Sequence, residues 1–219
     1  MPIPLRFRAP FRADQFYYLN FLSIDGLLLF RTSQHRKVFI KNCHLFLQPF
    51  ATFWAYSFLP NQAHLVIKCK EDHLIKEELS WIPYRDRTRS MLSFIKESSS
   101  ELFNSMMERQ VNRMLVSYVN SYNYMEERKG GLFQKPFRRI WLSDMEALKE
   151  AVLFVHTCAQ KEGVVLDYRA HPYHSHDEIV RKSSALVDTQ SVMLLFESPE
   201  TYRLAHLKYA DQHITDLKQ

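Results

Sequence analysis

The chain has 219 residues, of which 46% are hydrophobic and 14% aromatic, which excludes a wholly disordered protein and fits one domain with short extensions. It has only four glycines and no Gly-rich phosphate-binding motif, which excludes the common nucleotide-binding folds. The net charge of +5 permits a nucleic-acid partner, but many soluble enzymes share this balance.

The N-terminal third of the chain predicts an arm, a strand and a helix in succession. Residues 1–14 contain three prolines among alternating Arg and Phe, and we expect an extended arm. Residues 15–22 are rich in aromatics and predict a strand, and Asp25-Gly26 predicts a turn. Thr32 or Ser33 is placed to cap a helix that runs to about residue 48.

A β-hairpin is the firmest local prediction. Residues 50–59 favour a strand, Pro60-Asn61 a turn, and residues 64–70 a second strand. This second strand begins with His64, and side chains two positions apart along a strand lie on the same face.

The rest of the chain is read mainly as helical. Residues 71–100 are polar and predict a short helix and a mobile loop, and residues 101–128 carry the longest helical periodicity. Residues 132–141 form a basic aromatic segment, Ser143 is predicted to cap a helix to about residue 161, and helices are expected near residues 184–196 and 201–214.

This order of strands and helices predicts an α+β fold, in which helices pack over one face of an antiparallel sheet. We divide the chain into an N-terminal arm (1–14), a main domain (15–166) and a C-terminal helical extension (167–219).

The three cysteines, Cys43, Cys69 and Cys158, are widely spaced and odd in number. This pattern is unlike a secreted disulfide scaffold and favours a reducing compartment. Asn20 and Asp25 interrupt the apolar stretch 16–30, so we expect neither a signal peptide nor a membrane span, and we expect a cytoplasmic protein.

Four segments in order carry a family resemblance: YSFLPNQAHLVI at 56–67, YVNSYN at 118–123, GLFQKPFRR at 131–139 and FVHTCAQKEGVV at 154–165. Together they resemble the insertion-sequence-200-like and REP-associated single-tyrosine (HUH) transposases. The resemblance spans roughly residues 16–173. It implies a ferredoxin-like antiparallel sheet, single-stranded or hairpin DNA as the partner, and a homodimer.

In that family two strand histidines at i and i+2 hold Mg²⁺ or Mn²⁺, which polarises a phosphate. A helix tyrosine attacks this phosphate and becomes joined to the DNA. The resemblance places Gln62 at the first histidine, His64 at the second, Phe154 at the tyrosine and Cys158 at a polar metal ligand one helical turn later.

Three of these four positions depart from the family's chemistry. Phe154 has no oxygen and cannot form a phosphotyrosine, Gln62 offers only a neutral amide, and Cys158 is a poor ligand for Mg²⁺. We therefore expect a DNA-binding protein that does not cleave by the family's route, with Mg²⁺ or Mn²⁺ only if a residual site survives.

Basic and aromatic residues are interleaved in the third segment, as in proteins that neutralise phosphates and stack on bases. An amphipathic strand with a charged outer face would give the same pattern, but the resemblance favours nucleic acid. The candidate DNA-contacting residues are Phe133, Lys135, Arg138 and Arg139, with Arg109 and Arg113 one turn apart on the long predicted helix.

Three alternatives stay open. A displaced tyrosine, Tyr118, Tyr122 or Tyr124, could act as nucleophile in an active transposase or nickase, although the first two have the spacing of core residues. The fold could instead serve a protein interaction. The dense group His171, His174, His176 and Asp177 could bind zinc, but no paired ligand spacing supports this and we expect a solvated loop.

Overall fold

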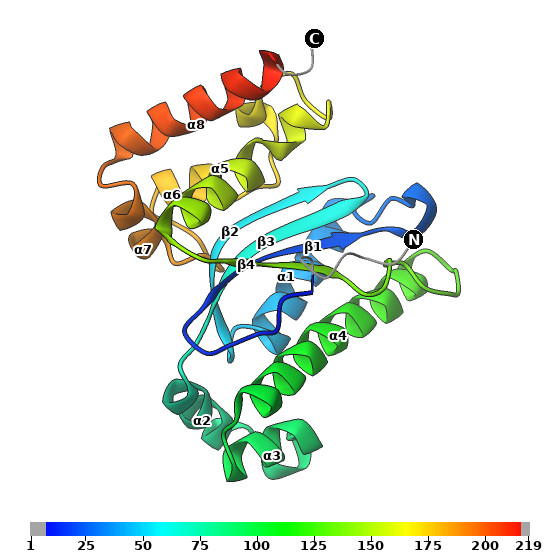
Figure 1. The fold of residues 1–219 in the computed structure, drawn as a ribbon. Helices are drawn as coiled ribbons and strands as arrows, with labels where there is room; N and C mark the ends of the chain where they lie inside the picture. Colours follow the sequence, from blue (N-terminus) through cyan, green and yellow to red (C-terminus); the bar gives the residue numbers. More distant parts are fainter. Residues whose placement is uncertain (1–7, 216–219) are drawn as a thin grey trace.

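The computed structural model describes residues 8–215. Its centre is a four-stranded antiparallel sheet in the order β2-β3-β1-β4, seen in Figure 1 between two groups of helices. The strands are β1 (Phe16–Leu22), β2 (Ala51–Leu59), β3 (Gln62–Cys69) and β4 (Arg138–Leu142). The β2–β3 hairpin predicted from Pro60-Asn61 is confirmed.

Two helices cover one face of the sheet and pack against each other: α1 (Ser33–Phe46) and α4 (Ser100–Met125). Two shorter helices, α2 (Asp72–Trp81) and α3 (Arg89–Lys96), connect β3 to α4, where we had expected one helix and a loop. The order strand, helix, strand, strand, helix, strand, with this strand arrangement, is the ferredoxin-like motif.

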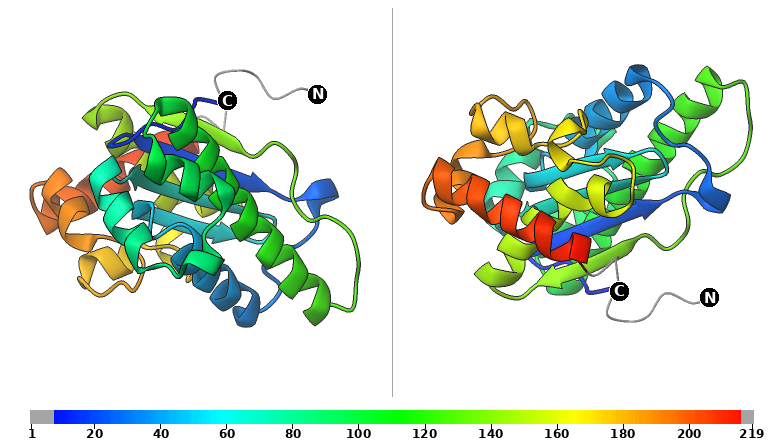
Figure 2. Two further views of the ribbon diagram at one scale, coloured as in Figure 1. Left: turned by 90° about the horizontal axis from the view of Figure 1, so that it is seen from below. Right: turned by 90° about the horizontal axis from the view of Figure 1, so that it is seen from above.

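The opposite face is covered by α5 (Met145–Lys161), so the expectation of helices over one face only is wrong. Outside α5 lie α6 (His176–Val180), α7 (Thr189–Leu195) and α8 (Pro199–Thr215), and α8 runs along α5 (Figure 2, right). The α+β class and the helical C-terminal region are thus confirmed. Residues 1–7 of the predicted arm and residues 216–219 lie outside the described residues.

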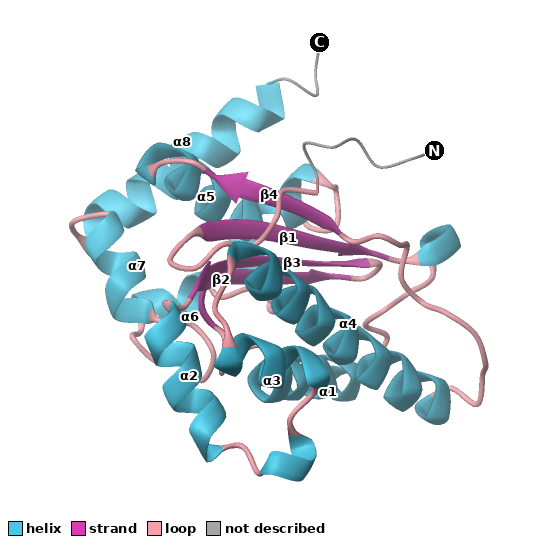
Figure 3. Ribbon diagram, turned by 60° about the horizontal axis from the view of Figure 1, so that its bottom comes forward, coloured by secondary structure: helices cyan, strands magenta, loops and turns pink. Residues whose placement is uncertain are grey.

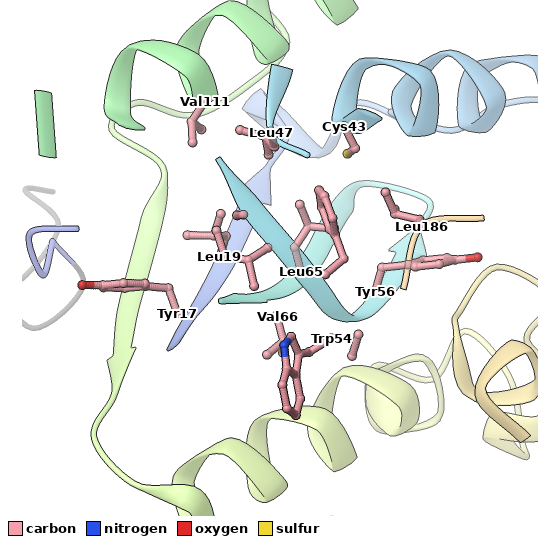
Figure 4. Close-up of a cluster of buried hydrophobic side chains, with 14 of the residues drawn as sticks. Tyr17, Leu19, Cys43, Leu47, Trp54, Tyr56, Leu65, Val66, Val111 and Leu186 are labelled. Carbon is pink, nitrogen blue, oxygen red and sulfur yellow. The ribbon is translucent and has the colours of Figure 1, made fainter. Parts of the chain in front are cut away.

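Hydrophobic side chains pack on both faces of the sheet because helices cover both faces. On β1 the odd residues Tyr17, Leu19 and Phe21 face α1 and α4 and are fully buried. Figure 4 shows Leu19 and Leu65 pointing toward this side, while Val66 and Trp54 point to the opposite side. Each fully buried side chain of this size stabilises the fold by about 1.5–3 kcal/mol.

A segment of the C-terminal region, residues 173–188, also lies against the outer edge of β2. The backbone N–H of Phe58 donates to the carbonyl of Tyr173 at 2.9 Å, Ser175 N–H to Tyr56 O at 3.0 Å, and Asp188 N–H to Phe53 O at 2.9 Å. Figure 3 shows the α6 and α7 region beside β2, at the opposite side of the sheet from β4. These bonds fix the C-terminal region to the sheet and satisfy polar groups of the edge strand.

Candidate functional site

The face of the sheet under α5 carries a row of polar residues across all four strands. Strand register aligns Arg138 of β4 with Asn20 of β1, Asn20 with His64 of β3, and His64 with Ser57 of β2. Asn20, Ser57 and His64 are buried, whereas Arg138 is exposed. Buried polar residues need partners, and at the centre of the row Asn20 and His64 contact each other through a hydrogen bond.

Four side chains form this network. The Asn20 amide donates to Gln62 Oε1 at 3.2 Å and approaches His64 Nδ1 at 3.3 Å. The Tyr18 hydroxyl lies 2.7 Å from the same Nδ1. Since Asn20 Nδ2 can only donate, Nδ1 is the accepting nitrogen, Tyr18 donates to it, and the His64 proton resides on Nε2. Within the described residues 8–215, that Nε2 is buried without a hydrogen-bond partner.

Phe154 lies over this network from α5. Its ring centroid is 5.8 Å from that of Tyr18 and 5.8 Å from that of His64, both edge-to-face. Lys161, two turns further along α5, holds its ammonium 5.7 Å from the Phe154 ring centre. Both side chains belong to α5, whose N-cap is Asp144: its carboxylate accepts from the Ala147 N–H. We had predicted Ser143 as the cap.

Burial shifts the titration of the network toward the neutral forms. It lowers the pKa of His64 to about 3, and it raises the pKa of the Tyr18 phenol, with the nearby Cys158 adding to the rise. Burial likewise raises the pKa of the Cys158 thiol to about 12. At neutral pH the site therefore holds a neutral imidazole, a neutral phenol and a protonated thiol.

The donor set does not fit a divalent ion. Gln62 Oε1 is engaged by Asn20, His64 Nδ1 by two donors, and the Cys158 thiol by the carbonyl of Val155 at 3.1 Å. Within residues 8–215, no three His, Cys, Asp or Glu side chains are grouped so that they could hold a metal ion. Among Gln62, His64 and Cys158, a hard cation such as Mg²⁺ would find no carboxylate and one buried imidazole.

A cavity of about 480 Å³ opens beside Phe154, bounded by β1, β4, α5 and α8. Aromatic rings from β1, α5 and α8 line it, and Arg138 of β4 stands at its wall. The side chains around it include Tyr18, Asn20, Arg138, Glu150, Phe154 and Tyr209.

The predicted DNA-contacting residues do not form one surface. Arg138 lines the cavity and Lys135 is exposed nearby in sequence. Arg109 and Arg113 flank a separate groove of about 770 Å³ along α4, on the other side of the sheet from α5 (Figure 1). Any DNA contact they make is separate from the α5 cavity.

Two of those residues are corrected by the structure. Phe133 is 5% exposed and packs edge-on against Phe21, so its ring is not available for stacking on a base. Arg139 is buried, donates to Glu108 Oε1 at 2.9 Å, and lies 4.1 Å from the Phe11 ring centre. Strand alternation explains the second correction, because Arg138 and Arg139 must point to opposite faces.

The tyrosines considered as substitutes lie on α4, away from the α5 face. Tyr118 and Tyr122 are buried and donate to the carbonyls of Leu29 and Leu28, as their core-like spacing indicates. Tyr124 is 88% exposed. The tyrosine that does lie at the site is Tyr18, which the sequence reading had assigned only to a strand.

The histidine-rich segment is buried, so the expectation of a solvated loop is wrong. His171, His174 and His176 are 4–6% exposed and gather around His156 of α5 and His206 of α8, both fully buried. Hydrogen bonds hold the two central rings: His156 Nδ1 lies 2.9 Å from His206 Nε2, and His206 Nδ1 lies 2.7 Å from the Tyr202 carbonyl. In the sequence, the residue that points to a buried histidine cluster is His156, which falls on the buried side of an amphipathic helix.

The comparisons with known proteins give one likeness of fold. No protein-family model matches the chain, and no curated protein matches it. Among solved structures, it is similar to a REP-associated tyrosine transposase bound to a REP hairpin, with 14% sequence identity and a TM-score of 0.49. The match covers 81% of this chain and 87% of that one. Of the helices between residues 8 and 215, none is both long and apolar enough to span a membrane.

Proposed function

We propose that this protein binds single-stranded or hairpin DNA and does not cleave it through position 154. One observation carries the proposal: the four positions of the transposase resemblance, Gln62 and His64 on β3 and Phe154 and Cys158 on α5, meet between this strand and this helix, beside a cavity with an arginine in its wall. A site with this layout retains a surface for a strand of nucleic acid but has lost the attacking oxygen.

The chemistry of the retained side chains supports binding without the family's cleavage step. Phe154 has no hydroxyl, and the Cys158 thiol is protonated and buried. Arg138 brings positive charge to the cavity that Phe154 lines, and the Lys161 ammonium lies 5.7 Å from the Phe154 ring centre. Cations beside aromatic rings suit a single strand, since they meet the phosphates while the rings meet the bases.

The test is fluorescence-polarisation binding of the full chain to a labelled DNA hairpin with a single-stranded flank, titrated with salt. We expect affinity that falls as salt rises, because phosphate neutralisation releases counterions. The same samples, with Mg²⁺ or Mn²⁺, are run on a denaturing gel, where we expect no covalent adduct. Absence of binding to hairpin, single strand and duplex would contradict the proposal.

The double variant Phe154→Tyr with Gln62→His provides a second arm, because it restores the two side chains that the resemblance lacks. Binding by this variant, with or without cleavage, agrees with an inherited DNA site. A folded double variant that neither binds nor cleaves hairpins would argue against that inheritance.

A second candidate function, strand cleavage by a displaced tyrosine, is favoured by the 2.7 Å contact between the Tyr18 hydroxyl and His64 Nδ1. In such a step the Tyr18 oxygen attacks phosphorus and its proton passes to His64. The bond from phosphorus to one ester oxygen breaks, and that oxygen takes the proton from His64. The raised pKa of Tyr18 and the lowered pKa of His64 oppose this step, so we place it second.

A covalent protein–DNA adduct would reverse the order of the two candidates. If Tyr18 is the nucleophile, the adduct is lost in Tyr18→Phe and kept in Tyr124→Phe, whose side chain is exposed on α4. Loss in neither variant would assign the adduct to another residue.

A further inference from the structure

Two large aromatic side chains lie exposed where the chain turns from α2 into α3. Trp81, the last residue of α2, is 81% exposed, and Tyr84, three residues later, is 73% exposed. Single exposed apolar side chains are ordinary on a protein surface, but two large rings within four residues form a concentrated apolar surface. Core packing does not account for them, because these helices turn other residues to the core, among them Leu79 and Met91.

The turn that carries the two rings is fixed by hydrogen bonds. The Arg87 guanidinium donates to the Ile82 carbonyl at 2.8 Å and to the Ser80 carbonyl at 3.1 Å. Carbonyls at the C-terminus of a helix lack partners within it, so this arginine closes the end of α2. Thr88 caps α3 by accepting from the Met91 N–H at 3.3 Å, and α3 packs on α4. The rings are therefore held on a fixed support, which reduces the entropy lost when a ligand binds.

The charge around the rings is positive. Residues 79–96 contain four basic side chains and one acidic side chain: Arg85, Arg87, Arg89 and Lys96 against Asp86. Two carboxylates precede the turn on α2, Glu77 and Glu78, and Glu78 is paired with Lys70, so the balance stays positive. Asp86 neutralises Arg85 only in part, because their contact is 3.8 Å long and both side chains are exposed.

Exposed rings beside exposed arginines match the chemistry of an unpaired nucleic-acid strand. Its bases stack on aromatic side chains while cations meet its phosphates. A protein partner is the other class of macromolecule that aromatic side chains bind. The two rings offer at most about 500 Å², whereas each side of a typical protein interface buries about 800 Å². We therefore take the unpaired strand as the partner of this turn.

We propose that Trp81 and Tyr84 stack on unpaired bases of the single-stranded part of the DNA, while Arg85 and Arg89 contact its phosphates. The proposal rests on the DNA-binding function proposed above. It adds a contact outside the α5 site, since α2 and α3 lie at the end of the molecule away from α5 (Figure 1). This contact is tolerant of base sequence, because every base has a face on which a ring can stack.

The experiment uses the full chain and two labelled ligands, a DNA hairpin with a single-stranded flank and a blunt duplex of the stem sequence. Trp81→Ala should weaken binding of the flanked hairpin about tenfold, the effect of losing one stacked base, and leave binding of the duplex unchanged. Trp81→Phe keeps a ring and should retain most of the affinity. Tyr124→Ala is the matched control, because Tyr124 is 88% exposed near the other end of α4.

Tryptophan emission gives a second readout. Of the three tryptophans, Trp54 is buried, Trp141 is 46% exposed and Trp81 is 81% exposed. Binding of the flanked hairpin should quench the emission, and this quenching should be largely lost in Trp81→Phe. Arg85→Gln combined with Arg89→Gln should lower the salt dependence of binding by about two phosphate contacts. All these side chains are on the surface, so the variants should melt at the temperature of the unaltered protein.

The possible failures are distinguishable. Salt-sensitive binding that Trp81→Ala leaves unchanged, without quenching that depends on Trp81, would overturn the stacking turn and leave DNA binding intact. Equal weakening for the flanked hairpin and the blunt duplex would also overturn it, since the duplex offers no unpaired base. A changed oligomeric state of Trp81→Ala in sedimentation, with unchanged DNA affinity, would assign the turn to a protein contact instead. No binding to either ligand or to a single strand would overturn both proposals.

Discussion

The Tyr18 hydroxyl donates to His64 Nδ1 across 2.7 Å, from the neighbouring strand and directly under the Phe154 ring. This contact ties β1 to β3 on the face that α5 covers. It occupies His64 Nδ1, and among residues 8–215 the other ring nitrogen, Nε2, is buried without a hydrogen-bond partner.

Tyr18→Phe removes that donor, and we expect the free energy of unfolding to fall by about 1 kcal/mol, the usual contribution of one hydrogen bond. Urea denaturation measures the change. Tyr124→Phe, on an exposed residue, should be neutral. A Tyr18→Phe protein as stable as the unaltered chain would show that Asn20 alone satisfies His64 Nδ1.

The neighbours Arg138 and Arg139 should have separable effects, because one is exposed at the cavity and the other is buried against Glu108. Arg139→Gln should lower stability by about 1–3 kcal/mol, since a buried charge-assisted bond is lost, with little change in DNA affinity below the melting temperature. Arg138→Gln should leave the melting temperature nearly unchanged and reduce the salt dependence of binding by about one phosphate contact. The opposite assignment of these two effects would contradict the orientation of β4.

Acid should destabilise the protein through its histidine cluster. Burial lowers the pKa of His174 and His206 to about 3 and of His171 to about 4, against an ordinary value of 6.5. Below pH 6.5 the unfolded chain binds protons that the folded chain excludes. Stability is therefore full above this pH and falls as pH decreases toward 4, by about 1.4 kcal/mol per pH unit for each such histidine.

Urea denaturation at pH 7.5, 6.5 and 5.5 measures this slope. The carboxylate of Asp177 lies 2.9 Å from His176 Nδ1 and raises the pKa of His176 and of His174, in each case against the larger effect of burial. His174→Gln should flatten the slope, while His73→Gln, on a 70% exposed side chain, should not. Stability that is constant from pH 7.5 to 5.5 would indicate that the cluster is hydrated.

The three thiols should resist modification in the folded state. Cys43, Cys69 and Cys158 are all fully buried, and burial raises the pKa of each, for Cys158 to about 12. Since the thiolate is the reactive form, we expect a chromogenic disulfide reagent to label them only as fast as the protein opens. Rapid labelling of one thiol without denaturant would show local opening at that element.

Local sequence signals were enough for much of the fold. Pro60-Asn61 between two β-rich runs gave the β2–β3 hairpin, Thr32 marked the start of α1, and the apolar spacing through Tyr118 and Tyr122 gave α4. These features depend on neighbours along the chain, which a sequence displays directly.

Features that depend on distant packing were missed. Arg139 and Phe133 looked like surface residues of a basic segment, and only the pairing of β4 with β1 shows which side chains turn inward. The histidines after residue 170 looked solvated because their partners, His156 and His206, lie on other helices. For the same reason Tyr18 had no visible link to His64 before the β1–β3 register was known.

The covered edge of β2 has a consequence for association. The backbone carbonyls of Phe53 and Tyr56 and the backbone N–H of Phe58 already form hydrogen bonds with the segment from Tyr173 to Asp188. A second copy therefore cannot extend the sheet by adding a strand along this stretch of β2, the route by which bare edges cause aggregation. If two copies associate, as the transposase resemblance led us to expect, we expect contact through other surfaces, such as helices or the β4 edge, where within residues 8–215 one isolated bridge joins Arg8 to Arg139.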